Sequence, residues 1–336
     1  MDYAIGQHSL KCISCGEAEV IEVAEMDFTA HDYRSTSQQM DRGDVNAVQH
    51  ELHCENCGAD FVMPAQVHAD ECPYCDLNVV VPLDLERQLT PDGLMPFEVN
   101  QQRAEKGFKD WLHGLWFAPN ALKKKAIQAR PIVGSYMPLW SFDADTYTRY
   151  TGSRGDNYVT TVRRNGQTQT VVKTRWRNVS GDVEVKFDDL LVLGTDSLPL
   201  KFQNFLSNWQ LSESMSYDDR YLSGFRSELY TIPLSQGLNN AKHVMNDVIR
   251  AHVRRDIGGD HQRIYGTDTD YHNLGFQLIL APIWISAFNY NNKTFRYVIN
   301  GQTGKAYGER PWSWWKIGSL IVTLVVAGVA AYYYSQ

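Results

Sequence analysis

The 336-residue sequence has the composition of an ordinary folded protein, with 43% hydrophobic and 21% charged residues, and a formal charge of −7. Residues 1–100 hold 19 Asp and Glu against four Lys and Arg, or −15, and the remaining 20 Asp and Glu against 28 Lys and Arg give +8. Because phosphate backbones bind to basic faces, this distribution argues against nucleic-acid binding by the N-terminal region.

All six cysteines lie within the first 75 residues, in Cys-x-x-Cys pairs. The pairs are Cys12/Cys15, Cys54/Cys57 and Cys72/Cys75. Disulfide frameworks usually spread cysteines through a small secreted chain, whereas such pairs are typical of reduced metal sites in the cytosol. The start of the sequence also lacks the basic residues and the apolar run of a secretory signal peptide.

The second and third pairs have the spacing of one complete zinc ribbon, predicted at residues 50–80 of a zinc-ribbon region that covers residues 1–80. Two Cys-x-x-Cys turns joined by a short hairpin supply four thiolates in a tetrahedron around zinc. Gly58 follows the first turn, where the chain often requires a positive φ angle. With all four positions filled by protein, the zinc is expected to be structural.

The first pair, Cys12 and Cys15, resembles half of a ribbon, because no cysteine lies between Cys15 and Cys54. Three interpretations stay open: a mixed zinc site completed by a histidine, a cysteine pair shared between subunits, or a degenerate ribbon held by packing. The histidines available for a mixed site are His31, His50 and His53.

Residues 90–310 are predicted to form a cytosolic α+β domain, an antiparallel sheet with helices. Apolar residues recur at helical spacing over residues 104–116 and again over residues 241–253. Each helix precedes a similar phrase, Pro-Leu-Trp at 138–140 and Pro-Ile-Trp at 282–284. The repetition predicts a duplicated unit of helix and hairpin.

Short antiparallel strands and turns are predicted between and after these phrases. The expected strands are Tyr158–Val162, Thr168–Lys173, Val183–Phe187 and Phe295–Ile299. The expected turns lie at Arg164–Gly166 and Ser180–Asp182.

A transmembrane helix with aromatic flanks is predicted at residues 312–334. Residues 317–331 carry no charge, tryptophans precede this run, and three tyrosines follow it. Aromatic residues at both ends of an apolar segment favour the two interfaces of a bilayer. The positive-inside rule uses the cations before the helix, which are Lys305, Arg310 and Lys316. It predicts a single-pass protein of the inner (plasma) membrane with a cytoplasmic N-terminal portion.

No catalytic constellation is evident in the sequence. It contains no Gly-x-x-x-x-Gly-Lys-[Ser/Thr] phosphate loop, no Gly-x-Gly-x-x-Gly and no Gly-x-Ser-x-Gly. The best polar cluster, Asp256, Asp260 and His261, follows a helix end. We therefore predict a protein that is not an enzyme.

Several phrases together resemble a bacterial family of membrane-anchored zinc-ribbon proteins of the transcription-factor-IIB type. These phrases are the ribbon ending in CPYC, MPLWSFDADTYTRYTGSRG, Trp176–Gly181, Phe187–Asp189 and NGQTGKAYGERPWSWWKI. Members are often labelled primosomal protein N′ (replication factor Y), but a helicase needs a phosphate loop that this sequence lacks. The resemblance implies protein partners related to phage-shock protein A or to flotillins.

Two functions from different classes follow. The first is a non-enzymatic scaffold or adaptor, anchored in the membrane and presenting a cytosolic docking surface within a membrane-stress module. The alternative is a nucleic-acid-binding ribbon protein related to replication restart, without helicase activity. The −15 charge of residues 1–100 favours the scaffold.

Overall fold

The computed structural model describes the chain apart from residues 13, 23–28, 41–49, 54–59, 64–66, 72–77, 81–88, 120–131, 165–166, 199–201, 203–208, 291–292, 310–312 and 335–336. Its helices are α1 (Tyr33–Met40), α2 (Gln101–Gly114), α4 (Leu234–Ile257) and α5 (Trp314–Tyr334), with 3-10 turns η2 (Leu211–Glu213) and η3 (Asp219–Leu222). The N-terminal strands are β1 (Asp2–Ala4), β2 (Ser9–Lys11), β3 (Ala18–Val20), β4 (His31–Asp32), β5 (His50–His53), β6 (Asp60–Met63), β7 (Val67–Glu71), β8 (Asn78–Val80) and β9 (Gly93–Leu94). The later strands are β10 (Val133–Arg164), β11 (Gln167–Leu193), β12 (Met215–Ser216), β13 (Arg226–Glu228), β14 (His261–Tyr290), β15 (Lys293–Asn300) and β16 (Ala306–Gly308).

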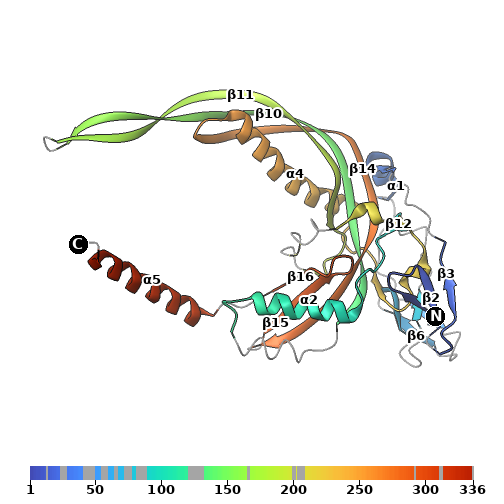
Figure 1. The fold of residues 1–336 in the computed structure, drawn as a ribbon. Coiled ribbons are helices and arrows are strands. Elements are labelled where there is room, and N and C mark those ends of the chain that lie inside the picture. Colours follow the sequence, from blue (N-terminus) through green and yellow to red (C-terminus); the bar gives the residue numbers. More distant parts are fainter. Residues whose placement is uncertain are drawn as a thin grey trace.

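Three very long strands form the spine of the molecule (Figure 1). The central strand β10 pairs antiparallel with β11 on one side and with β14 on the other, within an 11-stranded sheet. The register shifts between Phe142 and Ala144 and between Thr151 and Gly152. Such bulges bend a strand, and the sheet curves away from the body into a projecting arm.

Helix α4 lies along the sheet because its sequence places one apolar stripe at helical spacing. Ala241, Met245, Ile249 and Val253 are fully buried and belong to one core with Trp140 of β10 and other large side chains of the sheet. Helix α2 covers another part of the body. Its buried residues are Ala104, Phe108 and Leu112.

Two tryptophans tie the helices to the sheet in a reciprocal arrangement. The Trp140 indole of β10 donates to the Ile232 carbonyl, 3.0 Å away, and the Trp284 indole of β14 donates to the Val99 carbonyl, 2.8 Å away. Each carbonyl belongs to the residue directly before a helix N-cap, of α4 for Ile232 and of α2 for Val99. The tryptophan of the first Pro-x-Trp phrase thus contacts the start of α4, which precedes the second phrase, and the tryptophan of the second contacts the start of α2, which precedes the first. The exchange supports the predicted duplication, which stays a prediction.

The coarse fold prediction is confirmed, since the chain is a mixed α+β protein dominated by sheet, with one apolar C-terminal helix. The helices predicted over 104–116 and 241–253 correspond to α2 and to part of α4, and the strand Phe295–Ile299 lies within β15.

The turn predicted at Ser180–Asp182 is wrong, and the short strands predicted on either side of it merge into β11. The reason lies across the sheet. Gly181 pairs with Tyr150, and a Cβ atom at Gly181 would lie only 2.8 Å from the Tyr150 hydroxyl. This glycine makes room for a neighbouring ring instead of ending a strand.

Candidate zinc centre and membrane anchor

The first Cys-x-x-Cys pair lies in a tight turn between β2 and β3. Lys11 and Ala18 pair across the hairpin and enclose residues 12–17. The Cys12 N–H donates to the Glu17 carbonyl at 2.8 Å, and the Gly16 N–H donates to the Cys12 carbonyl at 2.9 Å. Gly16 has a φ of +76°, which glycine adopts without strain. These hydrogen bonds close a tight turn at the first Cys-x-x-Cys pair.

The two sulfur atoms of this turn are accessible and reduced. Both cysteines are free, and Cys15 is exposed. Hydrogen bonds to the Cys12 sulfur from the Cys15 N–H, then from the Cys15 thiol and the Ser14 N–H, lower the pKa of Cys12. A lowered pKa favours the thiolate, which is the form that binds zinc.

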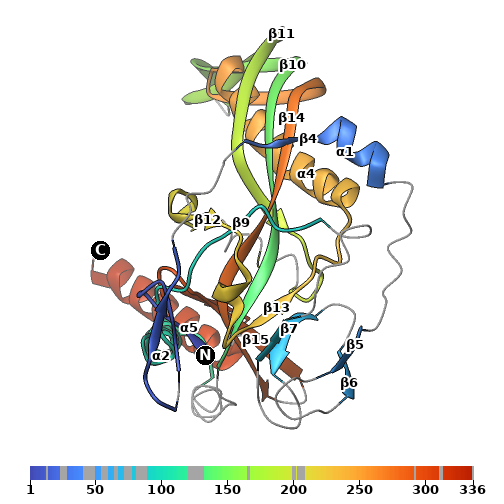
Figure 2. The same cartoon turned by 90° about the vertical axis from the view of Figure 1, so that its right-hand side faces the viewer.

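The other two pairs occupy equivalent positions between paired strands. His53 pairs with Asp60 across the β5–β6 hairpin, and Glu71 pairs with Asn78 across the β7–β8 hairpin. The enclosed segments 54–59 and 72–77 equal residues 12–17 in length, and each begins with its Cys-x-x-Cys motif. Cys54, Cys57, Cys72 and Cys75 themselves lie outside the described residues. Figure 2 shows both hairpins at the N-terminal end of the body, far from the end of the arm.

Further ligands for Cys12 and Cys15 were predicted among three histidines. His31 has another partner, because its Nε2 lies 2.5 Å from the Asp92 carboxylate. The side chains of His50 and His53 lie outside the described part of the structure. Among the described residues, no three His, Cys, Asp or Glu side chains gather closely enough to hold a metal ion.

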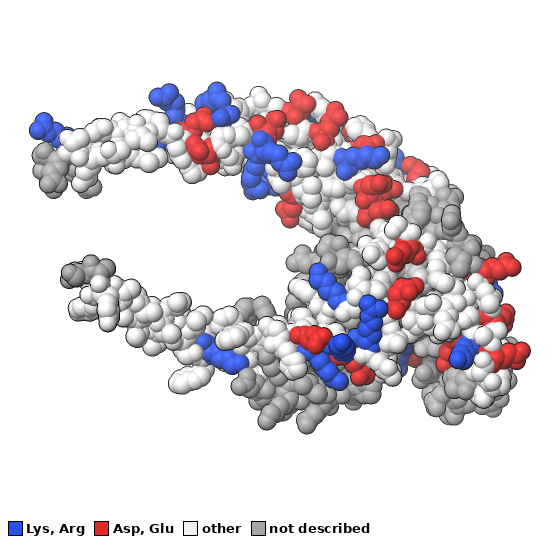
Figure 3. All heavy atoms as spheres, in the orientation of Figure 1, with Lys and Arg blue, Asp and Glu red and all other residues white. Residues whose placement is uncertain are grey.

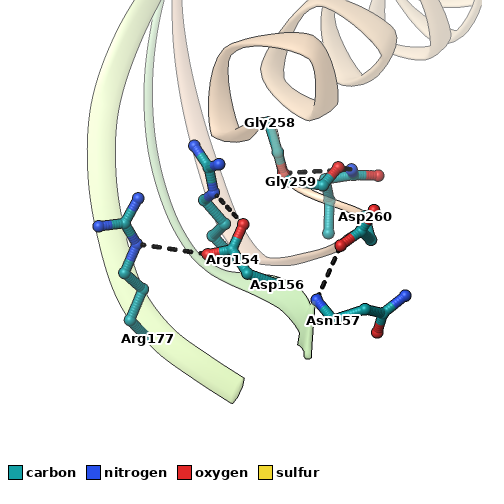
Figure 4. A network of polar contacts seen from close by, with 8 residues as sticks. Arg154, Asp156, Asn157, Arg177, Gly258, Gly259 and Asp260 are labelled. Carbon is teal, nitrogen blue, oxygen red and sulfur yellow. Dashed lines mark hydrogen bonds and ion pairs between the residues drawn. The ribbon is translucent and has the colours of Figure 1, made fainter. Parts of the chain in front are cut away.

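The cluster Asp256, Asp260 and His261 does not form one constellation. The Tyr150 hydroxyl donates to Asp256 at 2.5 Å, while Asp260 accepts from the Asn157 N–H at 2.7 Å (Figure 4). The His261 ring lies 6.2 Å from the Trp176 ring. The contacts of both carboxylates connect the end of α4 to the arm and so stabilise the fold.

Helix α5 is long and apolar enough to cross a membrane, and none of its residues is buried. Leu324, Val325 and Val326 are each about 60% exposed. The core helix of a soluble protein would bury these side chains, whereas no element of the described residues covers them here.

The start of α5 is fixed to the loop that follows α2. Lys316 donates through Nζ to the carbonyls of Trp116 and Ala118, at 3.1 and 2.8 Å, and the Ser313 N–H donates to the Phe117 carbonyl at 2.8 Å. Trp116 is 78% exposed. The sequence pattern missed Trp116 as an anchor residue, because it lies some 200 positions before Lys316 and only the fold brings the two together.

Trp314 and Trp315 are 80% and 88% exposed at the same place. They lie in the first turn of α5, and the backbone of the exposed Trp116 contacts Lys316 of the same turn. Tryptophan rings favour the headgroup level of a bilayer.

Comparison with known proteins finds a distant relative but assigns no function. An uncharacterized protein, YdjG of Bacillus subtilis (strain 168), is 23% identical over 238 residues, which cover 70% of this chain and 68% of the relative. No family model matches the sequence. No solved structure matches it significantly either.

Proposed function

We propose that the protein is a non-enzymatic scaffold, anchored in a membrane by α5, that presents a zinc-stabilised docking surface to the cytosol. The observation that carries the proposal is the apolar helix α5, none of whose residues is buried, joined to the body beside the exposed Trp116, Trp314 and Trp315. Lys316 lies at the body end of α5. With Lys305 and Arg310 also before the helix, the positive-inside rule places the body in the cytoplasm.

Zinc is proposed to hold the N-terminal module rigid. Cys54, Cys57, Cys72 and Cys75 would bind one structural ion between the β5–β6 and β7–β8 hairpins, and their equivalence to the Cys12–Cys15 turn supports this assignment. Four thiolates leave no coordination position for water, so this ion would do no chemistry. A second ion at Cys12 and Cys15 would need ligands from outside that turn.

Metal analysis of the purified chain tests the zinc proposal. We expect at least one zinc per chain, lost in a Cys54→Ser/Cys72→Ser variant, while a Cys12→Ser/Cys15→Ser variant keeps the ion of the complete ribbon. Loss of that ion should also lower the melting temperature, because binding energy of a structural zinc is folding energy. A wild-type chain that purifies folded without zinc contradicts the proposal.

Protein partners are proposed from the family resemblance, as relatives of phage-shock protein A or of flotillins. The supporting features are an N-terminal module of −15 charge and a projecting arm, both extended surfaces on one anchored chain. Crosslinking in intact cells followed by purification and mass spectrometry tests this proposal. Recovery of one such partner with the wild type, lost with the Cys54→Ser/Cys72→Ser variant, is the expected outcome.

Nucleic-acid binding is the competing function, and the basic residues of the arm are the observation in its favour. Salt-titrated binding of duplex and single-stranded DNA to the full chain in neutral detergent separates the two functions. We expect weak binding at physiological salt. Sub-micromolar affinity that falls steeply with salt would replace the scaffold with a nucleic-acid-binding function.

A further inference from the structure

The outer end of the arm is a two-stranded ribbon without cover. The last residue pair between β10 and β14 is Gly155 with His261, and α4 ends at Ile257. Beyond this point the described residues of β10 and β11, 157–164 and 167–177, pair only with each other (Figure 1). We call residues 157–177 the distal ribbon.

The distal ribbon is strongly basic. It contains five cations, Arg163, Arg164, Lys173, Arg175 and Arg177, and neither Asp nor Glu. Lys173, Arg175 and Arg177 alternate along β11, so they share one face of the ribbon, and all three are exposed. Figure 3 shows Lys and Arg side chains along the outer part of the arm.

The opposite face of the distal ribbon combines exposed apolar side chains with threonines and with Arg163. Val159 and Val172 are directly paired across the strands and are 68% and 66% exposed. Trp176 follows on the same face, and the Arg263 guanidinium lies 4.0 Å above its ring. A cross-strand pair of valines usually contributes to a sheet by packing against a covering layer, which is absent from these described residues.

The base of the ribbon is held by polar contacts, so its direction is fixed (Figure 4). Arg154 donates to Asp156 at 2.8 Å, and Arg177 lies 4.0 Å from the same carboxylate. The Asp260 carboxylate, just beyond α4, accepts from the Asn157 N–H. Asp156 offsets the charge only at the base, and the outer cations extend beyond it.

We propose that the distal ribbon binds the surface of an anionic lipid bilayer, as a second membrane contact of the chain. The inference rests on the proposed membrane anchor. Exposed cations attract anionic headgroups, and the paired valines and Trp176 suit the boundary between headgroups and acyl chains. Basic ribbons also enter DNA grooves, where bare valine pairs have no evident role.

The placement of the ribbon also favours a bilayer. Figure 1 shows that the arm and α5 extend from the same side of the body, whereas the N-terminal strands lie on the other side. The basic end of the arm, and not the acidic module, therefore lies on the side of the body from which α5 extends.

The test uses the full chain held by α5 in nanodiscs of uncharged phosphatidylcholine, immobilised and exposed to added vesicles. Phosphatidylglycerol vesicles should bind, and phosphatidylcholine vesicles should not. A Lys173→Ser/Arg175→Ser/Arg177→Ser variant should bind phosphatidylglycerol about 100-fold more weakly, given the attraction of each basic residue near an anionic surface. A Lys186→Ser/Arg254→Ser/Arg255→Ser variant removes as much exposed charge away from the ribbon and should bind like the wild type.

A second variant, Val159→Thr/Val172→Thr, keeps the charge and the strand propensity. It should weaken vesicle binding several-fold and leave the salt dependence unchanged. Equal loss in the two charge variants, or no binding of phosphatidylglycerol by the wild type, overturns the proposal. Tighter binding of added duplex DNA than of vesicles, lost only in the ribbon variant, assigns the ribbon to nucleic acid.

Failure of the membrane anchor gives a different result. A chain without a transmembrane helix would not enter the nanodiscs at all. Its ribbon can still be assayed by sedimentation of the full chain with phosphatidylglycerol vesicles, so the anchor and the ribbon are judged separately.

Discussion

Strands β10 and β11 pass through two regions that differ in side-chain composition and burial but share one continuous ladder of backbone hydrogen bonds. Near the body, β10 reads Tyr136–Phe142, and nearly every side chain is buried beneath helices and loops. In the distal ribbon the same strand reads Tyr158–Arg164, with Thr, Val and Arg, and no helix covers it. The backbone ladder continues across both regions. Pairing alone therefore sets the course of the strands, while burial decides where stability resides.

The largest expected difference between the two regions concerns their tryptophans. Trp140 is fully buried and hydrogen-bonded to Ile232, so Trp140→Ala should lower the free energy of unfolding by about 3–5 kcal/mol. Trp176 of the distal ribbon is 37% exposed, and Trp176→Ala should cost less than about 1 kcal/mol. Urea unfolding of the full chain in mild detergent measures both, and equal costs would refute the contrast.

Gly152 lies at the register shift of β10, between the buried part of the strand and the distal ribbon. A Cβ atom at Gly152 would lie 2.4 Å from the Arg263 carbonyl oxygen and 3.1 Å from the Ile257 side chain. Gly152→Ala should therefore destabilise the arm by about 1–3 kcal/mol. Gly266→Ala is the matched control, since its Cβ would meet only Thr151 at 3.7 Å. Hydrogen exchange of the arm amides should respond to the first change alone.

A smaller and pH-dependent effect is expected at Tyr150, where α4 ends against the sheet. Burial and the hydrogen bond to Asp256 raise the pKa of Tyr150 to about 12. The raised pKa contributes stability that is fully present below pH 10 and is lost as the pH rises towards 12. Tyr150→Phe should cost about 1–2 kcal/mol at pH 8.

The Tyr150→Phe cost should shrink above pH 10, because the tyrosine of the unfolded wild type ionises there while the folded state keeps its proton up to about pH 12. Tyr158→Phe in the distal ribbon is the control and should change the unfolding free energy at neither pH. A cost at Tyr150 that stays constant up to pH 12 would contradict the assignment.

Much of this organisation is readable from the sequence, but not the long-range pairings. Periodic apolar residues predicted α2 and α4, and fifteen uncharged residues predicted the core of α5. The residues Ser180–Asp182 are typical of a turn, but they lie inside β11. The partner strand β10 pairs with them, and the Tyr150 ring fills the space at Gly181. Local propensity yields to such pairing.

Among the candidate sites, too, some were predicted from the sequence and others were not. Cys-x-x-Cys spacing predicted the zinc knuckles, which stay a prediction, and the structure adds that each pair begins a six-residue segment between paired strands. The contact of Lys316 with the carbonyl of Trp116 and the basic face of the distal ribbon were not predicted. The contact joins residues far apart in the sequence, and the exposure of the alternating cations depends on where pairing with β14 stops, which local patterns do not encode.

Membrane retention tests the central claim most directly. Membranes from cells that produce the full chain are extracted with alkaline carbonate, which removes peripheral proteins. We expect the wild type to stay in the membrane and a Val325→Arg/Val326→Arg variant to be released, because each arginine at the centre of a span costs roughly 3 kcal/mol. A wild-type chain that carbonate releases completely would contradict the account.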